Sequence, residues 1–586
     1  MAALFLIAAG GLVARLWYLQ IAHGDEYLQM AQVNRIRLLR SPAPRGAIID
    51  SRGSVLAAMR PQYAIYAEPS VAKSPLILER LSHLLGGSPA EIAATITALK
   101  KNDYDLVRIA LNVPIRVVTQ IEEERPYLPG ISTAPEAVRW YPNADLLANV
   151  LGTVGRITPG EIANDANADY SPNDFVGRTG LEEQYEPELR GTPGGTKVEI
   201  DAQGKPMQEI GEQDPVQGET LQLAIDDRVE AAAERVFAQH HWTGGAAAVD
   251  PQTGAVIALT SSPSFDPNLF AAGISLKNWN RLNGDPRRPM LDRAVDALYP
   301  PGSTFKQVVA AAGLQSGAVT TDSSVDCTGV YDLGKARFHD WEVHGEVDFT
   351  RAIAVSCDVF FYQLGQKMGA DALAHYACEY PIAQHTGIDL PQESTGTMPS
   401  PEWKMSRFAR LGPKYQQWYG GDTLNTSIGQ GYVLVTPLQM ALVTATTANG
   451  GYVLRPYLVS RILDPNTHAP ISETQMVILR RVDIAPEYLA DVCEGMRECV
   501  TDGTGAVVDF PSLPVGAKTG SAQATGAGLT HGWFVAFAPY DHPTIACAAV
   551  VEHGGHGGDS AGLVVRAMLQ AYFDIQSGAL RTAKSD

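Results

Sequence analysis

The stretch YPPGSTFKQVVAAA (residues 299–312) decides how the second half of this chain folds. Its Pro-Pro-Gly turn ends one element, and the apolar run after it predicts a buried helix. Ser303 then lies in the first turn of that helix, with Lys306 on the same face because residues three apart are helix neighbours. A serine hydroxyl is a weak nucleophile until a nearby base takes its proton. The pair makes Ser303 a candidate nucleophile, but taken alone Ser303 could equally be a helix cap, so the assignment depends on further motifs.

Two more motifs follow in the sequence, Ser356-Cys357-Asp358 and Lys518-Thr519-Gly520-Ser521. Together with the first motif they predict a serine acyl-transfer site. Small residues in the last motif allow a substrate backbone to lie along a strand edge. We therefore expect Asp358, Thr519, Gly520 and Ser521 to bind substrate.

The chemistry assigns a role to each catalytic candidate. Lys306 is a base only if its pKa is depressed, and burial, the helix dipole and a second cation at Lys518 would each act in that direction. Ser356 can relay a proton between the lysines and the leaving amine. A backbone N–H of the Lys-Thr-Gly strand, with that of Ser303, would form an oxyanion hole.

A second S-x-x-K sequence, Ser70 to Lys73, shows how little this pattern means alone. It lies in a polar stretch flanked by proline, with no other catalytic motif near it in the sequence. We expect it to take no part in catalysis.

Length and composition limit the class of protein. A chain of 586 residues exceeds one ordinary core, so two or three domains are expected. The net charge of -19 argues against nucleic acid as a partner. Six cysteines are too few for a disulfide framework in a chain of this length.

The N-terminus predicts a membrane anchor. Residues 1–14 are wholly apolar, and Trp17 and Tyr18 are typical of a membrane interface if Arg15 extends to the surface. Because no small-residue cleavage site follows, residues 1–22 favour an uncleaved signal anchor with the rest of the chain outside the cytoplasm. A buried N-terminal helix is the alternative, and a few cytoplasmic residues before Met1 are left open.

The remaining chain divides into two modules and a tail. Residues 23–235 predict an extended, membrane-proximal pedestal with short helices at 76–85 and 89–99. Residues 236–575 predict an α+β domain, and residues 576–586 a C-terminal tail. Within the second module we expect a hairpin at 245–260, helices over 303–450, strands at 532–538 and 544–551, and a final helix at 560–573. This order predicts an antiparallel sheet flanked by helices.

The chain resembles the class B penicillin-binding proteins, most closely the penicillin-binding protein 2 type of rod-shape elongation. The resemblance rests on these segments: residues 15–20, 44–46, 180–182, 299–303, 427–431 and 532–535. It implies a transpeptidase fold similar to serine β-lactamases, crosslinking of peptidoglycan stem peptides in the periplasm, and acylation of Ser303 by β-lactams. It also implies a glycosyltransferase of the RodA type and MreC-like elongation proteins as partners at the inner membrane.

One position departs from the usual family pattern. The middle motif commonly ends in Asn, whereas here it ends in Asp358, as in many sequences of the elongation type. A carboxylate cannot donate a hydrogen bond unless it is protonated. How position 358 contacts a substrate amide is therefore left open.

Thiols, imidazoles and carboxylates between the first two motifs predict a structural zinc site, since four such ligands close a tetrahedral shell. The chosen ligands are Asp326, Asp340, His344 and Cys357, with Cys327 or His339 as substitutes. The alternative is a reduced, buried Cys357 beside solvated side chains. Some relatives carry a zinc at the corresponding cysteine, which supports the site by resemblance; acyl transfer itself requires no cofactor.

Other functions remain as alternatives. A division-type transpeptidase would share the same motifs. A carboxypeptidase or β-lactamase would pass the acyl group to water, but the anchor and long first module argue against it. A β-lactam sensor or a scaffold that activates a glycosyltransferase is the non-catalytic alternative. The segment 553–559 is expected to be a loop near the rim of the active site.

Overall fold

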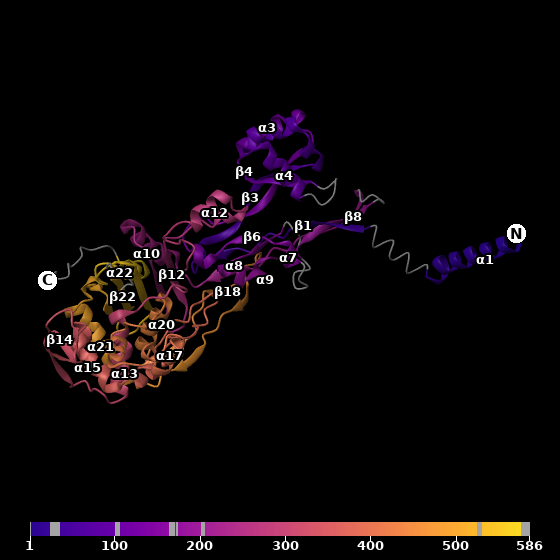
Figure 1. The fold of residues 1–586 in the computed structure, drawn as a ribbon. Coiled ribbons are helices and arrows are strands. Elements are labelled where there is room, and N and C mark those ends of the chain that lie inside the picture. Colours follow the sequence, from indigo (N-terminus) through magenta and orange to yellow (C-terminus); the bar gives the residue numbers. More distant parts are fainter. Residues whose placement is uncertain are drawn as a thin grey trace. The chain divides into compact units, whose positions relative to one another are not determined.

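The chain forms two compact units, each assembled from separated stretches of sequence (Figure 1). The first, here called the N-terminal unit, comprises residues 1–47, 58–140 and 187–219. The second, the C-terminal unit, comprises residues 48–57, 141–186 and 220–586. The computed structural model describes residues 2–23, 36–99, 106–162, 170, 174–200, 206–523 and 530–575. The predicted tail at 576–586 lies outside the described residues.

In the N-terminal unit, β3 (Val55–Ala67) pairs with β5 (Ile131–Trp140) and β4 (Val107–Val113), both antiparallel. The helices α3 (Pro75–Leu85), α4 (Pro89–Leu99) and α5 (Ile115–Glu123) supply apolar residues to the same core. A separate sheet has the order β1 (Ile36–Ser41), β8 (Gly194–Ile200), β9 (Pro206–Gln213). The two predicted short helices are confirmed.

At the N-terminus, helix α1 spans Ala2–Trp17 and continues as the π-helical turn η1 (Tyr18–Ala22). Among residues 2–23 and the rest of the described chain, no helix has both the length and the apolar character needed to cross a membrane.

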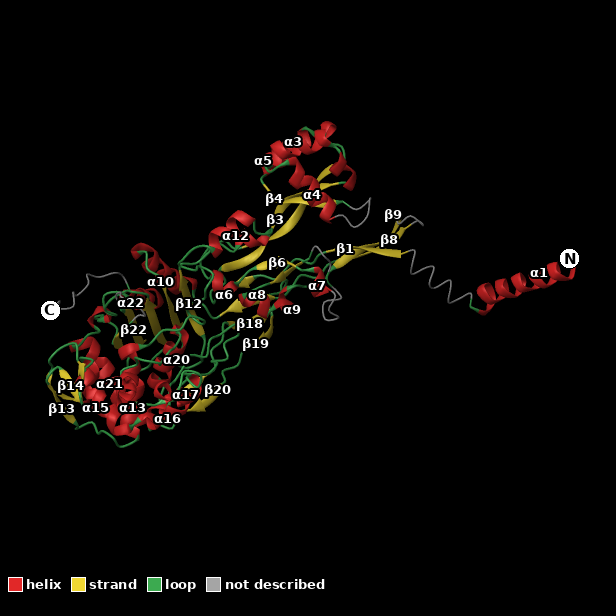
Figure 2. Cartoon of the chain, viewed as in Figure 1, coloured by secondary structure: helices red, strands yellow, loops and turns green. Residues whose placement is uncertain are grey.

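The centre of the C-terminal unit is a five-stranded antiparallel sheet (Figure 2). Its order is β12 (Val256–Ser262), β11 (Gly244–Val249), β23 (Ile545–Val551), β22 (His531–Ala538), β21 (Gly516–Ala522). Helices α10 (Asp227–His240) and α22 (Ala561–Tyr572) pack on one face and share a core with alternate strand residues. Helix α20 (Pro437–Ala448) also packs against the sheet. The predicted hairpin, closing strands and final helix are confirmed.

Further helices pack together and carry the first two motifs. They are α13 (Lys306–Gln315), α14 (Phe349–Ala354), α15 (Asp358–Met368), α16 (Ala370–Glu379), α19 (Gly420–Ser427) and α21 (Pro486–Asp502). Helices dominate residues 303–450, as predicted. Four short strands interrupt them: β13 (Ser324–Cys327), β14 (Val330–Leu333), β15 (Ala336–His339) and β16 (Gly345–Asp348).

Smaller elements complete the C-terminal unit. Four strands pair in the order β19 (Pro470–Glu473), β18 (Val459–Leu463), β10 (Thr220–Leu223), β2 (Ile48–Ile49). Strand β2 also pairs with the start of β3. Two-stranded sheets join β17 (Tyr452–Leu454) to β20 (Ile478–Arg481) and β6 (Val154–Arg156) to β7 (Phe175–Gly177). The remaining helices are short: α6 (Ala148–Leu151), α7 (Pro159–Ile162), α8 (Gly180–Gln184), α11 (Asn268–Ala271), α12 (Leu276–Asn283), α17 (Pro401–Arg407) and α18 (Pro413–Gln416).

Candidate active site

Two glycines bring the first and third motifs together. Gly302 has φ 55°, and a Cβ there would lie 2.8 Å from the carbonyl oxygen of Ser521. A Cβ on Gly520 would lie 3.1 Å from the carbonyl oxygen of Pro301. These close approaches place β21 against the 3-10 turn η5 (Gly302–Phe305), in which Ser303 is partly exposed. The expected juxtaposition of Ser303 with the Lys-Thr-Gly strand is therefore present.

Lys306 joins the first motif to the second. Its side chain is fully buried, and Nζ donates to the carbonyl oxygen of Ser356 at 2.7 Å and to Ser356 Oγ at 3.2 Å. It also forms an ion pair with Asp358 Oδ1 at 2.5 Å and lies 5.1 Å from the ring centre of Phe361. The Asp358 carboxylate thus accepts a hydrogen bond from the motif lysine, and its contact with a substrate amide stays a prediction.

Lys518 has a different environment. It is also fully buried, and its Nζ donates to the carbonyl oxygen of Thr519 at 3.1 Å. Burial lowers the pKa of Lys518 to about 7, and the positive charge of Lys306 acts in the same direction. A lysine in this state offers a neutral amine near neutral pH. Lys518 is therefore a second candidate for the base, beside Lys306, which the sequence suggested.

Ser356 is held in an uncommon backbone conformation between α14 and α15. Its φ is 62°, in the left-handed region, and its side chain is 6% exposed. Cys357 caps α15 by accepting a hydrogen bond from the backbone N–H of Phe360 at 3.4 Å. This turn directs Ser356 toward Lys306 and places Asp358 at the first position of the helix, on the same lysine.

The second S-x-x-K sequence has different surroundings from the first. Ser70 is exposed on the short 3-10 helix η2 (Pro69–Lys73), and its hydroxyl donates to Glu68 Oε2 at 3.3 Å. It lies in the N-terminal unit, whereas the three motifs lie in the other unit.

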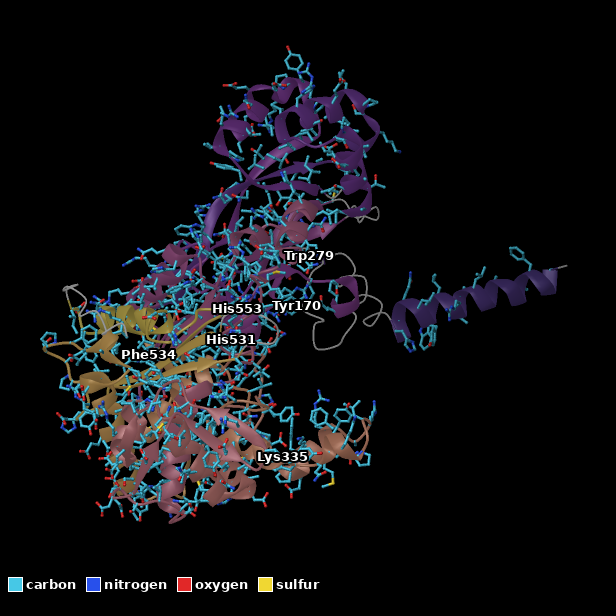
Figure 3. The ribbon with its side chains drawn as sticks, turned by 60° about the vertical axis from the view of Figure 1, so that its left-hand side comes forward. Tyr170, Trp279, Lys335, His531, Phe534 and His553 are labelled. Atoms are coloured by element: carbon cyan, nitrogen blue, oxygen red, sulfur yellow. The ribbon has the colours of Figure 1, made fainter. Side chains whose placement is uncertain are left out.

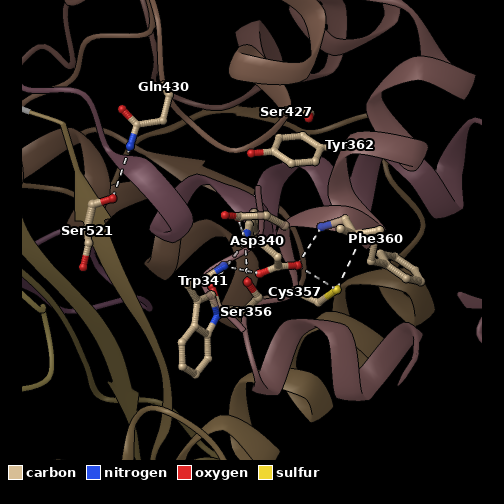
Figure 4. A network of polar contacts seen from close by, with 12 residues as sticks. Asp340, Trp341, Ser356, Cys357, Phe360, Tyr362, Ser427, Gln430 and Ser521 are labelled. Carbon is tan, nitrogen blue, oxygen red and sulfur yellow. Dashed lines mark hydrogen bonds and ion pairs between the residues drawn. The ribbon is translucent and has the colours of Figure 1, made fainter. Parts of the chain in front are cut away.

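The sequence prediction missed Gln430, which supports the edge strand of the site. Strand β21 is the last of its sheet, so no strand among the described residues pairs with its outer edge, here called the open edge. Gln430 Nε2 donates to the carbonyl oxygen of Ser521 at 3.2 Å (Figure 4). Its Oε1 accepts from the backbone N–H of Gln523 at 3.3 Å. The signal was the Gly-Gln-Gly segment at 429–431, quoted for its resemblance but given no role.

A cluster of potential metal ligands includes the cysteine of the second motif. Its members are Cys327, Asp340, His344 and Cys357. Asp340 Oδ2 is 3.3 Å from the sulfur atoms of both cysteines and 3.7 Å from His344 Nδ1. The same carboxylate oxygen accepts from the backbone N–H of Val359 at 2.9 Å, which ties the cluster to α15 (Figure 4).

The choice of Asp326 as a ligand needs correction. Successive side chains of a strand point to opposite faces, so Asp326 and Cys327 of β13 cannot both reach the cluster. Cys327 is fully buried and faces it, while Asp326 is exposed. Cys327 is thus the substitute that the sequence left open, and His339 lies outside the cluster.

Within this cluster, the pKa of the Asp340 carboxyl is lowered and that of the Cys357 thiol is raised. Burial alone would raise the pKa of Asp340, but hydrogen bonds from His344 and from the backbone N–H of Val359 lower it well below its usual range. Burial, with the nearby Asp340, raises the pKa of the Cys357 thiol. A neutral thiol therefore faces a firmly ionised carboxylate in the protein alone.

The glycine-rich segment after β23 lies at the site, as expected for the rim loop. A Cβ on Gly557 would lie 2.5 Å from the carbonyl oxygen of Gly520. Nearby, the rings of His531 and His553 are 5.1 Å apart (Figure 3), and His531 also contacts the ring of Tyr299, which begins the turn before Ser303.

An antiparallel sheet with a serine helix, two buried lysines and a Lys-Thr-Gly edge strand defines a serine acyl-transferase of the penicillin-binding class. Family comparison agrees: residues 244–570 match the penicillin binding protein transpeptidase domain and residues 40–223 the penicillin-binding protein dimerisation domain. The chain belongs to the class B penicillin-binding proteins of the penicillin-binding protein 2 (MrdA) type, which are serine-type peptidoglycan D,D-transpeptidases of cell elongation.

Relatives match nearly the whole chain. Peptidoglycan D,D-transpeptidase MrdA of Acinetobacter baumannii is 35% identical, covering 94% of this chain and 84% of the relative. The protein of the same name from Escherichia coli K12 is 31% identical, with 96% and 92% covered.

Solved structures agree. The penicillin-binding protein 2 of Helicobacter pylori, determined in complex with MreC, has a TM-score of 0.80 at 27% identity and covers 92% of this chain and 99% of its own. A structure described as a peptidoglycan synthase complex that coordinates polymerization and crosslinking matches with a TM-score of 0.72 at 31% identity, covering 99% of both chains.

Proposed function

We propose that Ser303 is the nucleophile that accepts the acyl group of a peptidoglycan stem peptide. Its Oγ attacks the carbonyl carbon of the D-Ala-D-Ala bond, and its proton passes to the lysine pair, with Lys518 as the neutral amine and Lys306 as the cation held by Asp358. Ser356, 3.2 Å from Lys306 Nζ, then delivers a proton to the departing amine of D-alanine. The contacts among the three motifs are the observation that supports this assignment.

The acyl-enzyme is resolved by the amine of a neighbouring stem. That amine attacks the ester carbonyl, a new amide forms, and Ser303 recovers its proton. Backbone N–H groups of Ser303 and β21 would stabilise the oxyanion in both steps. Thr519 and Ser521 lie on the open edge of β21, where their hydroxyl groups would bind the terminal carboxylate of the donor. A β-lactam would acylate the same serine and present its own carboxylate to the same edge.

Fluorescent-penicillin labelling of the purified protein tests this proposal. We expect wild type and Ser70→Ala to be labelled equally and Ser303→Ala to remain unlabelled. Ser70→Ala is the matched control because it removes the serine of the other S-x-x-K sequence. Labelling that persists in Ser303→Ala, or is absent from the wild type, would refute the assignment.

The anchor and the partners belong to the same proposal. We propose that residues 1–22 anchor the chain in the inner membrane with the transpeptidase domain in the periplasm, close to an MreC-like protein and a RodA-type glycosyltransferase. The apolar sequence supports the anchor, and the complex of the Helicobacter pylori relative supports an MreC-like partner. Co-purification of the full chain with each candidate, compared with a chain that lacks residues 1–22, tests this: loss of the glycosyltransferase alone would assign its contact to the anchor.

We also propose that Cys327, Asp340, His344 and Cys357 hold a structural zinc ion. Ligand atoms around a tetrahedral zinc lie about 3.3–3.8 Å apart, from the usual zinc–ligand bond lengths. The three separations from Asp340 Oδ2 (3.3 Å to each sulfur atom and 3.7 Å to His344 Nδ1) and the 3.5 Å between Cys327 Sγ and His344 Nδ1 fit this range, and all the ligand atoms lie within 4.8 Å of one another. Two thiols, an imidazole and a carboxylate are a suitable donor set. When bound, zinc would hold the thiols as thiolates and brace the turn that carries Ser356 and Asp358.

Elemental analysis of the purified protein tests the zinc site. We expect about one zinc per chain in wild type and in Asp326→Asn, and its loss in Cys327→Ser. Asp326→Asn is the matched control, since it alters the neighbouring residue on the opposite strand face. Equal zinc in Cys327→Ser and wild type would exclude this ligand set.

A further inference from the structure

The hydroxyl of Thr519 is the outer end of a chain of three side chains that begins in the protein interior. Thr519 Oγ1 and Thr504 Oγ1 are 2.6 Å apart, and Thr504 Oγ1 is 3.4 Å from Cys499 Sγ. Cys499 is fully buried near the end of α21, whereas Thr504 and Thr519 are only partly buried. The chain therefore runs from the core to the open edge of β21.

The backbone fixes Thr504 in this position. Its N–H donates to the carbonyl oxygen of Ala354 at 3.4 Å, and the N–H of Gly505 donates to the carbonyl oxygen of Cys499 at 2.8 Å. A Cβ on Gly503 would lie 2.4 Å from the carbonyl oxygen of Ala354. The Gly-Thr-Gly segment is thus held against both α14 and α21, and the Thr504 hydroxyl has little freedom to move away from Thr519.

Each of the three groups carries one hydrogen, so the chain has two possible directions. In the outward direction, the Cys499 thiol donates to Thr504, Thr504 donates to Thr519, and the hydrogen of Thr519 is free for a ligand at the edge of β21. In the inward direction, Thr519 donates to Thr504 and has no hydrogen for a ligand. The thiol of Cys499 donates and accepts only weakly, so it does not by itself select a direction. A carboxylate bound at the edge of β21 favours the outward direction, because a hydrogen bond to an ionised acceptor is the stronger kind.

We propose that Thr504 is a positioning residue that makes the Thr519 hydroxyl a hydrogen-bond donor to the terminal carboxylate of the acyl donor, with Cys499 as the inner end of the chain. This rests on the proposed function, in which Thr519 binds that carboxylate. Hydrogen bonds in such a chain polarise one another, so the outermost bond is the one that is strengthened. Thr504 would therefore favour acyl donors that carry a free carboxylate over acyl donors that lack one.

The test compares acylation rates of the purified full chain with benzylpenicillin and with its methyl ester, which lacks the carboxylate charge. We expect Thr504→Val to lower the rate with benzylpenicillin about three- to tenfold, the range of one ordinary hydrogen bond. The rate with the ester should change by less than about twofold, within the error of such comparisons. Thr504→Ser should restore the wild-type ratio of acid to ester. Thr501→Val, which alters an exposed threonine on α21, is the matched control.

A purely structural role of Thr504 would give a different result. It would lower both rates equally, and that outcome would overturn the proposal. The proposal would also be overturned if Thr504→Val lowered the rate with benzylpenicillin equally in the wild type and in the Thr519→Val variant. If Thr504 acts through Thr519, its replacement should have no effect on the rate once Thr519 is valine. Cys499→Ser keeps a donor at the inner end and should retain the acid-to-ester ratio, whereas Cys499→Ala should reduce it.

The experiments distinguish a failure of this proposal from a failure of the assignment of Ser303 as the nucleophile. If the wild type is not acylated, or Ser303→Ala is, the proposed function fails. If acylation depends on Ser303 but the acid-to-ester ratio ignores Thr504, only the hydrogen-bonded chain fails.

Discussion

At the scale of single residues, two lysines share one buried site but lie in different electrostatic environments. Lys306 has a carboxylate partner at 2.5 Å, whereas burial and the neighbouring cation lower the pKa of Lys518 to about 7. The proposed mechanism uses this difference: Lys518 serves as the neutral amine, and Lys306 stays paired with Asp358. This difference in environment comes from Asp358, which stands where the motif commonly has asparagine, because its carboxylate pairs with Lys306.

The pH dependence of acylation tests this difference between the two lysines. The neutral form of Lys518 exists above its pKa of about 7, so the rate of acylation by penicillin should rise with pH below that value and level off above it. Well below the midpoint, the slope should approach about tenfold per pH unit, as for a single titrating base. Stopped-flow measurements with a fluorescent penicillin follow this directly. A rate independent of pH through neutrality would show that Lys518 is not the base.

Replacing Asp358 with asparagine tests the ion pair itself. Asp358→Asn leaves the fully buried Lys306 without its counter-charge but with an oxygen acceptor, so the free energy of unfolding should fall by about 1–3 kcal/mol. Urea unfolding monitored by tryptophan fluorescence measures the change. Asp332→Asn is the control, because it breaks the exposed pair with Arg337 and should have no measurable effect. Equal stability of wild type and Asp358→Asn would contradict the role of the carboxylate.

At the scale of elements, the rim segment after β23 depends on glycine for its contact with β21. A Cβ on Gly557 would lie 1.9 Å from the carbonyl oxygen of Trp533 and 2.5 Å from that of Gly520, both backbone atoms of the sheet. Such contacts are relieved only by moving a strand or the loop.

Alanine substitution at adjacent glycines tests this packing. Gly557→Ala should reduce penicillin labelling at least about tenfold, since misplacement of a substrate-binding edge by an ångström has effects of this size or larger. Gly558→Ala is the matched control, because a Cβ there meets its nearest neighbour, the carbonyl oxygen of Thr504, at 3.4 Å, an ordinary contact. Similar labelling of both variants would mean that the loop does not position β21.

The elements also show what sequence can and cannot predict. Long apolar runs, such as those of β22 and β23, form fully buried strands and were identified correctly. Strands β13 to β16 have four residues each and are largely exposed, so no hydrophobic period marks them. Without β13, the opposite directions of Asp326 and Cys327 could not be foreseen. The ion pair between Lys306 and Asp358 joins two helices and is likewise a tertiary feature.

At the scale of the whole molecule, the unit that contains the active site draws on distant parts of the chain. Residues 48–57 and 141–186 belong to it together with 220–586. Helix α10 runs from Asp227 to His240, across the domain boundary expected at residue 236. Its Val229, Ala233 and Phe237 are fully buried in the core shared with α22 and the sheet. We therefore propose that the functional boundary lies before α10.

Two fragments test where this unit begins. A chain of residues 220–586 retains α10, whereas a chain of residues 241–586 lacks it and exposes the sheet face that Val229 and Phe237 cover. Burying each of these side chains contributes about 1.5–3 kcal/mol, so the shorter fragment loses a substantial part of a typical stability. Both fragments lack residues 48–57 and 141–186 of the unit, so only the difference between them reports on α10. We expect the longer fragment to have the higher unfolding midpoint and the stronger labelling by fluorescent penicillin. A fragment of residues 220–575 is the control for shortening as such and should behave like the longer chain. Equal labelling and equal unfolding midpoints for the fragments that begin at 220 and 241 would show that α10 is dispensable and that the boundary lies after it.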